Sequence, residues 1–223
     1  MSISNESRSR IKQVFEPIAL GMGRLGLTPD ALTLIGFAIT VLGAVLLAAN
    51  LWLVGGIVVF LGGAFDMFDG TLARATNQVS KLGAFMDSVF DRWGEAIVYL
   101  GIVTGAVLSI PHSGDVAVVG PDLVAILGAA AMGAAFMVSY ARAKSEGLGF
   151  TEGTGMAAVG IMPREVRLVV LSLGLVITGI TDSFLALLIA LAVITIGSIL
   201  TVIQRILHVR SQARAATTTP RNQ

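Results

Sequence analysis

The chain has 223 residues, of which 55% are apolar and 13% are charged. An average soluble domain has about 25% charged residues, so this composition excludes an ordinary soluble globular domain and indicates helices that cross a membrane. The net charge of +1 argues against a nucleic-acid partner. Because cysteine is absent and only two histidines are present, any bound metal ion would be held by oxygen atoms.

The first predicted element is an amphipathic helix over residues 8–24. Apolar side chains recur there at spacings of three and four residues, and charged side chains occupy the other faces. We expect this helix to lie in the membrane interface and to pack against the other helices rather than to span the bilayer. The first long apolar run begins only near Ala31, so we expect the N-terminus to be retained rather than cleaved as a signal peptide.

Six apolar segments follow, at about 31–49, 51–69, 88–110, 122–140, 166–181 and 184–204. Because about 20 apolar residues span the hydrocarbon core, the predicted fold is all-α and polytopic, with six transmembrane helices. One membrane domain over residues 1–211 is expected, followed by a disordered tail over residues 212–223. Within the third segment, Gly101 and Gly105 have a spacing that permits close helix packing.

The basic residues predict how these segments are oriented. All 15 Lys and Arg residues lie before the first segment, after the last, or around the second and fourth connections. By the positive-inside rule, both termini and these two connections face the cytoplasm. We therefore expect a multi-pass protein of the cell membrane with cytoplasmic termini.

Four aspartates surround the second connection. Asp66 and Asp69 are three residues apart, and Asp87 and Asp91 are four apart, so each pair lies on one face of a helix. Packed as an antiparallel hairpin, the two helices would bring all four carboxylates together. Four like charges at membrane depth need a counter-charge, and a hard divalent cation supplies one. Mg²⁺ is the expected ion because it commonly shares its ligand shell with substrate phosphates, and Mn²⁺ is the alternative.

Residues beside the aspartates indicate a phosphate-containing ligand. Gly70 and Gly83 lack side chains, which lets a bulky ligand approach the backbone, and Arg74 is placed to reach a phosphate on the metal ion. Two alternatives remain open at this point. The acids either form only interfacial ion pairs with Arg74 or Arg92, or they serve a cation or proton transporter. Their position at one membrane surface argues against the transporter.

The same stretch resembles the signature of the CDP-alcohol phosphotransferases, also called CDP-alcohol phosphatidyltransferases. The matching pattern is Asp66-x-x-Asp69-Gly70-x-x-Ala73-Arg74, eight residues, then Gly83-x-x-x-Asp87-x-x-x-Asp91. The resemblance covers the whole chain, including the interfacial helix and the six spans. It implies that an acceptor hydroxyl attacks the β-phosphorus of a CDP-lipid, CDP-diacylglycerol or CDP-archaeol, and releases CMP. It also implies a homodimer.

The resemblance further assigns roles to individual residues. Asp91 is the expected general base for the acceptor hydroxyl, and it completes the metal centre formed by Asp66, Asp69 and Asp87. Eight residues are expected to form the nucleotide site: Asp30, Thr33, Asp66, Asp69, Gly70, Ala73, Arg74 and Gly83. Glu95, one turn beyond Asp91, is expected to form an ion pair or to support the metal ligands rather than to bind metal itself.

A second basic cluster bears on the acceptor. Arg142 ends the fourth segment, while Arg164 and Arg167 open the fifth, on the same side of the membrane as the carboxylates. An inward group of guanidinium ions suits a phosphate monoester, although the ordinary positive-inside excess is the alternative interpretation.

This segment resembles the phosphatidylinositol-phosphate and archaetidylinositol-phosphate synthases, which implies inositol 1-phosphate as acceptor. The residues that match their phosphate-binding pattern are Ser139, Arg142, Arg164 and Arg167. A phosphatidylglycerophosphate synthase that uses glycerol 3-phosphate is the alternative. Asp91-Arg92 disfavours it, because those enzymes typically have Asp-Lys at this position.

Overall fold

The computed structural model describes residues 16–109, 120–150 and 156–218. The described residues form helices and no strands: a helix over residues 16–24, a short 3₁₀ helix η1 (Met156–Ala158) and six long helices. The long helices are α2 (Pro29–Ala48), α3 (Trp52–Ala75), α4 (Lys81–Leu108), α5 (Pro121–Gly147), α6 (Arg164–Thr181) and α7 (Leu185–Thr218). Each of the six predicted apolar segments is therefore helical.

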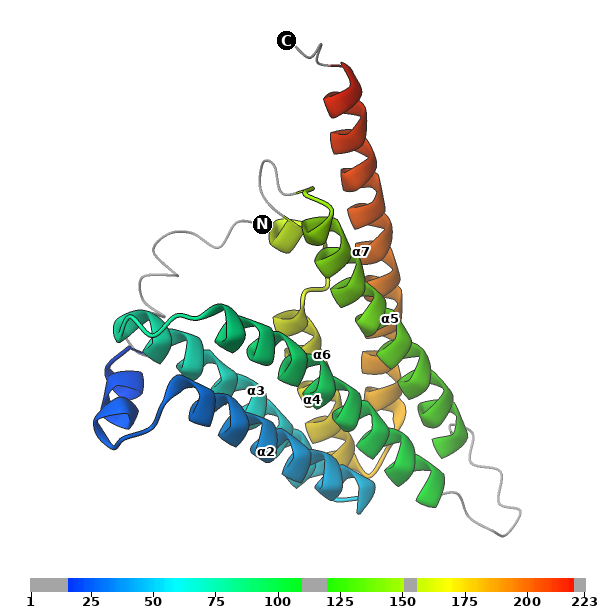
Figure 1. Cartoon of the computed structure of the whole chain (residues 1–223). Helices are drawn as coiled ribbons and strands as arrows, with labels where there is room; N and C mark the ends of the chain where they lie inside the picture. The colour runs from blue at the N-terminus through cyan, green and yellow to red at the C-terminus, as the bar shows by residue number, and fades with distance from the viewer. Residues whose placement is uncertain (1–15, 110–119, 151–155, 219–223) are drawn as a thin grey trace.

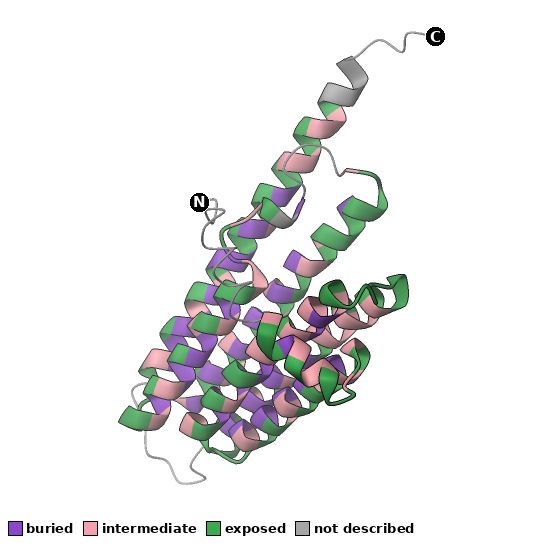
Figure 2. Cartoon of the chain, turned by 90° about the vertical axis from the view of Figure 1, so that its left-hand side faces the viewer, coloured by how far each residue is buried: buried purple, intermediate pink, exposed green. Residues whose placement is uncertain are grey.

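Four of these helices have the length and apolar composition needed to cross a membrane: α2, α3, α5 and residues 185–214 of α7. Charged residues lie in the first turn of α6 and in the first half of α4, which makes these two helices less apolar. Many large apolar residues are exposed, among them Leu100 at 61% and Ile126 at 64%. Figure 2 shows exposed positions along the helices of the bundle. An apolar outer surface fits a multi-pass protein in contact with lipid.

The six long helices form a ring, in the order α2, α3, α6, α7, α5, α4 and back to α2 (Figure 1). Each helix makes its main contacts with two others. The centre of the ring is filled by buried apolar side chains, among them Ile102, Leu175 and Leu191, none of which is exposed to solvent. In Figure 1, the end of α7 projects beyond the other helices.

Two hydroxyl side chains fix the beginning of the helices that lead into the site. The hydroxyl of Thr28 accepts a hydrogen bond from the backbone N–H of Ala31 at 3.2 Å, and the hydroxyl of Ser80 accepts one from Gly83 at 2.9 Å. Both arrangements satisfy N–H groups that the first turn of a helix leaves without partners. Pro29, whose fixed φ suits the first helical position, follows Thr28 directly.

The two glycines of α4 lie against the backbone of α2. A side chain at Gly101 would meet the carbonyl group of Ala44, and one at Gly105 would meet the carbonyl group of Leu47. The predicted close packing at these glycines is confirmed, and their partner is a helix of the same chain.

Several boundaries differ from the predicted ones. The second segment was expected to end at 69 and the third to begin at 88, but α3 continues to Ala75 and α4 already begins at Lys81. The predicted tail over 212–223 is wrong for residues 212–218, which belong to α7. Their alanine, glutamine and arginine residues favour a helix. Residues 219–223 lie outside the described part of the chain.

The N-terminal helix is described from residue 16 to residue 24. Ala19 and Met22 pack with Leu32 and Leu72, which confirms the predicted packing against the bundle. The remaining predicted helical residues, 8–15, lie outside the described residues, and the location of this helix in the membrane interface stays a prediction.

Candidate active site

The structure brings the four predicted aspartates together from α3 and α4. Asp87 lies close enough to Asp66, Asp69 and Asp91 for the negative charges to interact. The expected direct hairpin packing is nevertheless wrong, because α3 and α4 each make their main contacts with α2 instead of with each other. Like charges on the facing sides disfavour direct contact, and the separation leaves room for a ligand between the two helices.

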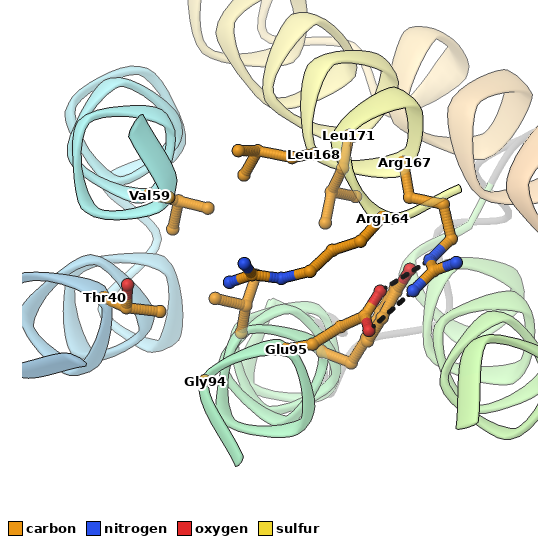
Figure 3. A pocket seen from close by; sticks show the side chains of 11 residues that line it. Thr40, Val59, Gly94, Glu95, Arg164, Arg167, Leu168 and Leu171 are labelled. Atoms are coloured by element: carbon orange, nitrogen blue, oxygen red, sulfur yellow. Dashed lines mark hydrogen bonds and ion pairs between the residues drawn. The ribbon is translucent and has the colours of Figure 1, made fainter. Parts of the chain in front are cut away.

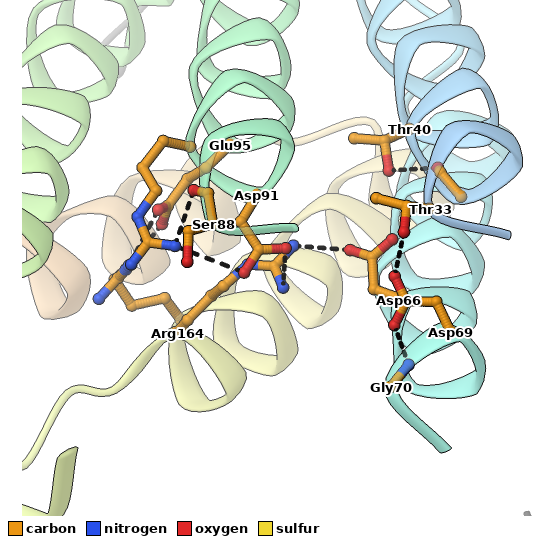
Figure 4. A network of polar contacts seen from close by, with 12 residues as sticks. Thr33, Thr40, Asp66, Asp69, Gly70, Ser88, Asp91, Glu95 and Arg164 are labelled. Atoms are coloured by element: carbon orange, nitrogen blue, oxygen red, sulfur yellow. Dashed lines mark hydrogen bonds and ion pairs between the residues drawn. The ribbon is translucent and has the colours of Figure 1, made fainter. Parts of the chain in front are cut away.

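Arg164, from the first turn of α6, lies between two of the carboxylates (Figure 4). Its Nη2 is 2.8 Å from Oδ2 of Asp66, and its Nη1 is 2.7 Å from Oδ1 of Asp91. Arg92 makes a longer contact, with Nη1 3.5 Å from Oδ2 of Asp91. Arg164 is therefore the main counter-charge of Asp66 and Asp91, and neither Arg74 nor Arg92 has this role.

Asp69 is held by a different set of groups. The Thr33 hydroxyl donates a hydrogen bond to Oδ2 of Asp69 at 2.5 Å, and the backbone N–H of Gly70 donates to Oδ1. The Asp69 residue is only 6% exposed, so its carboxylate depends on these two donors for its orientation. Thr33, which was expected to contact a nucleotide, thus also connects α2 to the carboxylate cluster.

A cavity of about 260 Å³ lies beside Asp69 and Asp87, between the starts of α2 and α4 and the end of α3. All the predicted nucleotide-binding residues except Asp66 line it: Asp30, Thr33, Asp69, Gly70, Ala73, Arg74 and Gly83. The absence of side chains at Gly70 and Gly83 keeps the cavity open to a ligand. The cavity therefore offers carboxylates, one guanidinium and exposed backbone to one ligand.

The donor atoms of the aspartate cluster fit a hard divalent cation. Asp66, Asp69, Asp87 and Asp91 offer only oxygen donors, which favour magnesium or manganese over zinc. Among the residues that the structure describes, no three His, Cys, Asp or Glu side chains are grouped so that they could hold a metal ion. The guanidinium of Arg164, which links Asp66 to Asp91, is the cation that stands among these carboxylates.

The predicted acceptor residues do not form one continuous site. Arg167 is only 2% exposed and forms an ion pair with Glu95, which confirms the ion pair predicted for Glu95 (Figure 3). Arg164 and Arg167 line a second cavity of about 40 Å³, which has room for a small group such as a phosphoryl group but not for a whole sugar phosphate. Arg142 is exposed, and its Nε lies 2.9 Å from Oε1 of Glu146. Ser139 is half-buried.

Arg205 of α7 is a basic residue of the site that the sequence analysis missed. It is 4% exposed, and its guanidinium donates to the backbone carbonyls of Val159, at 3.0 Å, and Val138. Its charge interacts with those of Arg142 and Arg167, so it connects two predicted acceptor residues. Arg205 is the first of four arginines that follow the last apolar segment, and its position next to that segment was the only available signal.

Comparisons with known proteins agree with this arrangement. A family model described as CDP-alcohol phosphatidyltransferase matches residues 26–203. The chain is 33% identical to the archaetidylinositol phosphate synthase of Pyrococcus horikoshii over 205 residues, which cover 92% of this chain and 95% of that protein. It is 34% identical to the phosphatidylinositol phosphate synthase of Corynebacterium glutamicum over 200 residues, which cover 89% of this chain and 85% of that protein.

The structure is also similar to solved structures of the phosphatidylinositol phosphate synthase of Mycobacterium tuberculosis. The complex with manganese and citrate has a TM-score of 0.75 and 26% identity, and covers 88% of this chain and 89% of that one. The structure with CDP-DAG bound has a TM-score of 0.72 and 28% identity, and covers 88% and 94% of the two chains. The chain therefore belongs to the CDP-alcohol phosphatidyltransferase family and is a membrane-bound transferase of phospholipid synthesis.

Proposed function

We propose that this enzyme transfers the phosphatidyl-type group of a CDP-lipid to inositol 1-phosphate and releases CMP. The observation that carries the acceptor assignment is the position of Arg164. It contacts Asp66 and Asp91 and lines one cavity with Arg167, so it joins the carboxylate cluster to a buried basic cluster. The names of both synthases given above describe an inositol phosphate lipid as the product, which supports the same acceptor here.

The donor nucleotide would occupy the cavity of about 260 Å³ beside Asp69 and Asp87. Arg74 lines this cavity and would pair with the pyrophosphate, while Gly70 and Gly83 allow the nucleotide to approach the backbone. Mg²⁺ or Mn²⁺, held by Asp66, Asp69, Asp87 and Asp91, would stabilise negative charge on the pyrophosphate and on the departing CMP. The manganese complex of the mycobacterial synthase supports such an ion.

Asp91 would remove the proton from the acceptor hydroxyl. The acceptor oxygen then forms a bond to the β-phosphorus, and the bond from that phosphorus to the oxygen of CMP breaks. The proton stays on Asp91 until it passes to solvent, and CMP leaves with the electron pair. Arg164, 2.7 Å from Asp91, orients the carboxylate for this proton transfer.

The acceptor phosphate would be bound by residues from the end of α5, from the beginning of α6 and from α7. Guanidinium groups suit this task because they bind phosphate oxygens in pairs. The proposed ligands are the four predicted residues together with the one found in the structure: Ser139, Arg142, Arg164, Arg167 and Arg205. A dianionic phosphate adds negative charge to a region where arginines outnumber their carboxylate partners, whereas an unphosphorylated acceptor such as serine does not.

We further propose that all six long helices cross the membrane, that the site and both termini face the cytoplasm, and that the enzyme is a homodimer. The distribution of lysine and arginine supports this orientation. The cysteine-free chain permits a direct test with single cysteines. In intact cells, a membrane-impermeant maleimide is expected to label Ser183→Cys but to label Ser211→Cys only after permeabilisation. The reverse pattern would contradict the orientation.

The acceptor is tested by CMP release from purified protein with CDP-diacylglycerol and Mg²⁺. Reactions with inositol 1-phosphate, glycerol 3-phosphate, serine and no acceptor are compared. Selective release with inositol 1-phosphate is expected, and selective release with glycerol 3-phosphate would overturn the acceptor while keeping the reaction class. If all reactions are silent, CDP-archaeol replaces the donor, and continued silence refutes the proposed function.

A further inference from the structure

Glu95 and Arg167 form a buried ion pair between α4 and α6 (Figure 3). Oε1 of Glu95 accepts a hydrogen bond from Nε of Arg167 at 2.7 Å, and Oε2 accepts one from Nη2 at 2.9 Å. The Arg167 side chain is 2% exposed and that of Glu95 is 13% exposed. Both carboxylate oxygens therefore hold one edge of the guanidinium in a plane.

The number of N–H groups that Arg167 uses within the protein indicates the role of this ion pair. Nη1 donates to the backbone carbonyl of Met162 at 3.0 Å, so Glu95 and Met162 together use three N–H groups. A guanidinium has five N–H groups, and two of those of Arg167 are left for another acceptor. Held on one edge by a carboxylate, the guanidinium is preorganised to bind an anion with the other.

The positive charge of Arg205 repels the guanidinium of Arg167, so this guanidinium has to be held in place. Arg205 is buried, interacts with the positive charges of Arg142 and Arg167, and donates hydrogen bonds to the backbone carbonyls of Val138 and Val159. Like charges in a poorly solvated site repel one another strongly. Glu95 is bound to Arg167 from the side of α4, so it keeps this guanidinium beside Arg205 against that repulsion.

We propose that Glu95 is a positioning residue for the acceptor: it fixes the guanidinium of Arg167 so that its two remaining N–H groups bind the acceptor phosphate beside Arg205. The inference rests on the proposed function, since it deepens the assignment of the same site. Glu95 itself does not touch the substrate. If the ion pair between Glu95 and Arg167 only joined α4 to α6, its loss would affect folding. If Glu95 positions Arg167, its loss affects acceptor binding selectively.

The experiment measures CMP release by Glu95→Gln as a function of inositol 1-phosphate and, separately, of CDP-diacylglycerol. Glutamine has an NH₂ group where Glu95 has a second acceptor oxygen, so it cannot accept hydrogen bonds from both Nε and Nη2 of Arg167. The acceptor KM is expected to rise about tenfold, the size expected for losing one hydrogen bond to a charged group, with the CDP-lipid KM within twofold of the wild type. Glu165→Gln, on the exposed surface of α6, is the matched control. It is expected to have the acceptor KM and the CDP-lipid KM of the wild type.

An unchanged acceptor KM, or an equal rise in both KM values, would overturn the role of Glu95. Wild-type enzyme that releases no CMP with inositol 1-phosphate would instead refute the proposed function, and the two failures are distinguishable. The Glu95→Gln variant leaves Arg167 without its buried counter-charge, which can prevent folding.

Arg167→Gln leaves the carboxylate of Glu95 without its partner, whereas the double variant with Glu95→Gln removes both charges and leaves neither one buried alone. If Glu95 acts through Arg167, the double variant has the same acceptor KM as Arg167→Gln alone. A further rise in the double variant would show that Glu95 acts independently and would overturn the proposal.

Discussion

Replacing Arg164 with glutamine tests whether this residue is the counter-charge of the carboxylate cluster. The guanidinium makes two contacts, at 2.8 Å to Asp66 and at 2.7 Å to Asp91. Glutamine keeps a polar side chain but removes the charge, so the two carboxylates face each other with less compensation. In metal-free buffer, we expect the variant to be less stable than the wild type.

The magnitude follows from these contacts. A hydrogen bond between charged groups contributes about 1.5–3 kcal/mol when it is well shielded. The side chain of Arg164 is 32% exposed, so solvent screening reduces the sum of the two contacts to about 2 kcal/mol. For a chain of this size, that loss corresponds to a decrease in Tm of about 4–8 °C.

Metal binding is expected to change in the opposite direction. A divalent cation competes with Arg164 for Asp66 and Asp91, and the variant no longer has this competitor. Removing a competing interaction of about 2 kcal/mol tightens binding by up to about 30-fold. The assay is thermal unfolding of purified protein in detergent, first with EDTA and then over a Mn²⁺ titration, with no substrate present.

Lys144→Gln is the control, because it removes one positive charge from an exposed position near the same end of the bundle. It is expected to leave both Tm and Mn²⁺ affinity within error of the wild type. Mn²⁺ affinity that stays unchanged or weakens in Arg164→Gln would refute the reasoning, since Arg164 would then not compete for the metal ligands.

Two further predictions concern residues of the carboxylate cluster. Asp91→Asn is expected to reduce the rate of CMP release by about 10²-fold or more, because the general base is lost; full retained activity would remove Asp91 from this role. Gly36→Ala is expected to lower Mn²⁺ affinity and CMP release, because a Cβ there would meet Oδ1 of Asp66. Gly133→Ala, where a Cβ meets no atom within 4 Å, is the matched control and should behave as the wild type, so equal loss in both variants would contradict the explanation.

The helices and the carboxylate cluster could be predicted because their signals are local. An apolar run of sufficient length specifies a helix in a membrane, and the spacing of Asp66 and Asp69 fixes which helix face carries them. Most residues that line the cavity of about 260 Å³ come from the same stretch, since Gly70, Arg74 and Gly83 flank the aspartates in sequence. Near neighbours in the chain are therefore also neighbours in the site.

The partners of the arginines could not be predicted from spacing. Arg164 and Arg167 are three residues apart on α6, yet the first contacts Asp91 and the second contacts Glu95, which lies one turn further along α4. Which helix packs beside which depends on the whole bundle, so neither these pairs nor the position of Arg205 follows from a local pattern. For the same reason, the contact of both α3 and α4 with α2 was found only in the structure.

The ring order of the helices has a consequence for how the protein is made. The helices are synthesised in chain order, so α3 and α4, which carry the four aspartates, are complete before α6 has been translated. Arg164 belongs to α6, so the main counter-charge of Asp66 and Asp91 arrives only after two more helices have emerged from the ribosome. Until then, a divalent cation or water must neutralise or solvate these carboxylates. A chain that ends before α6 therefore lacks the guanidinium that compensates Asp66 and Asp91 in the complete bundle.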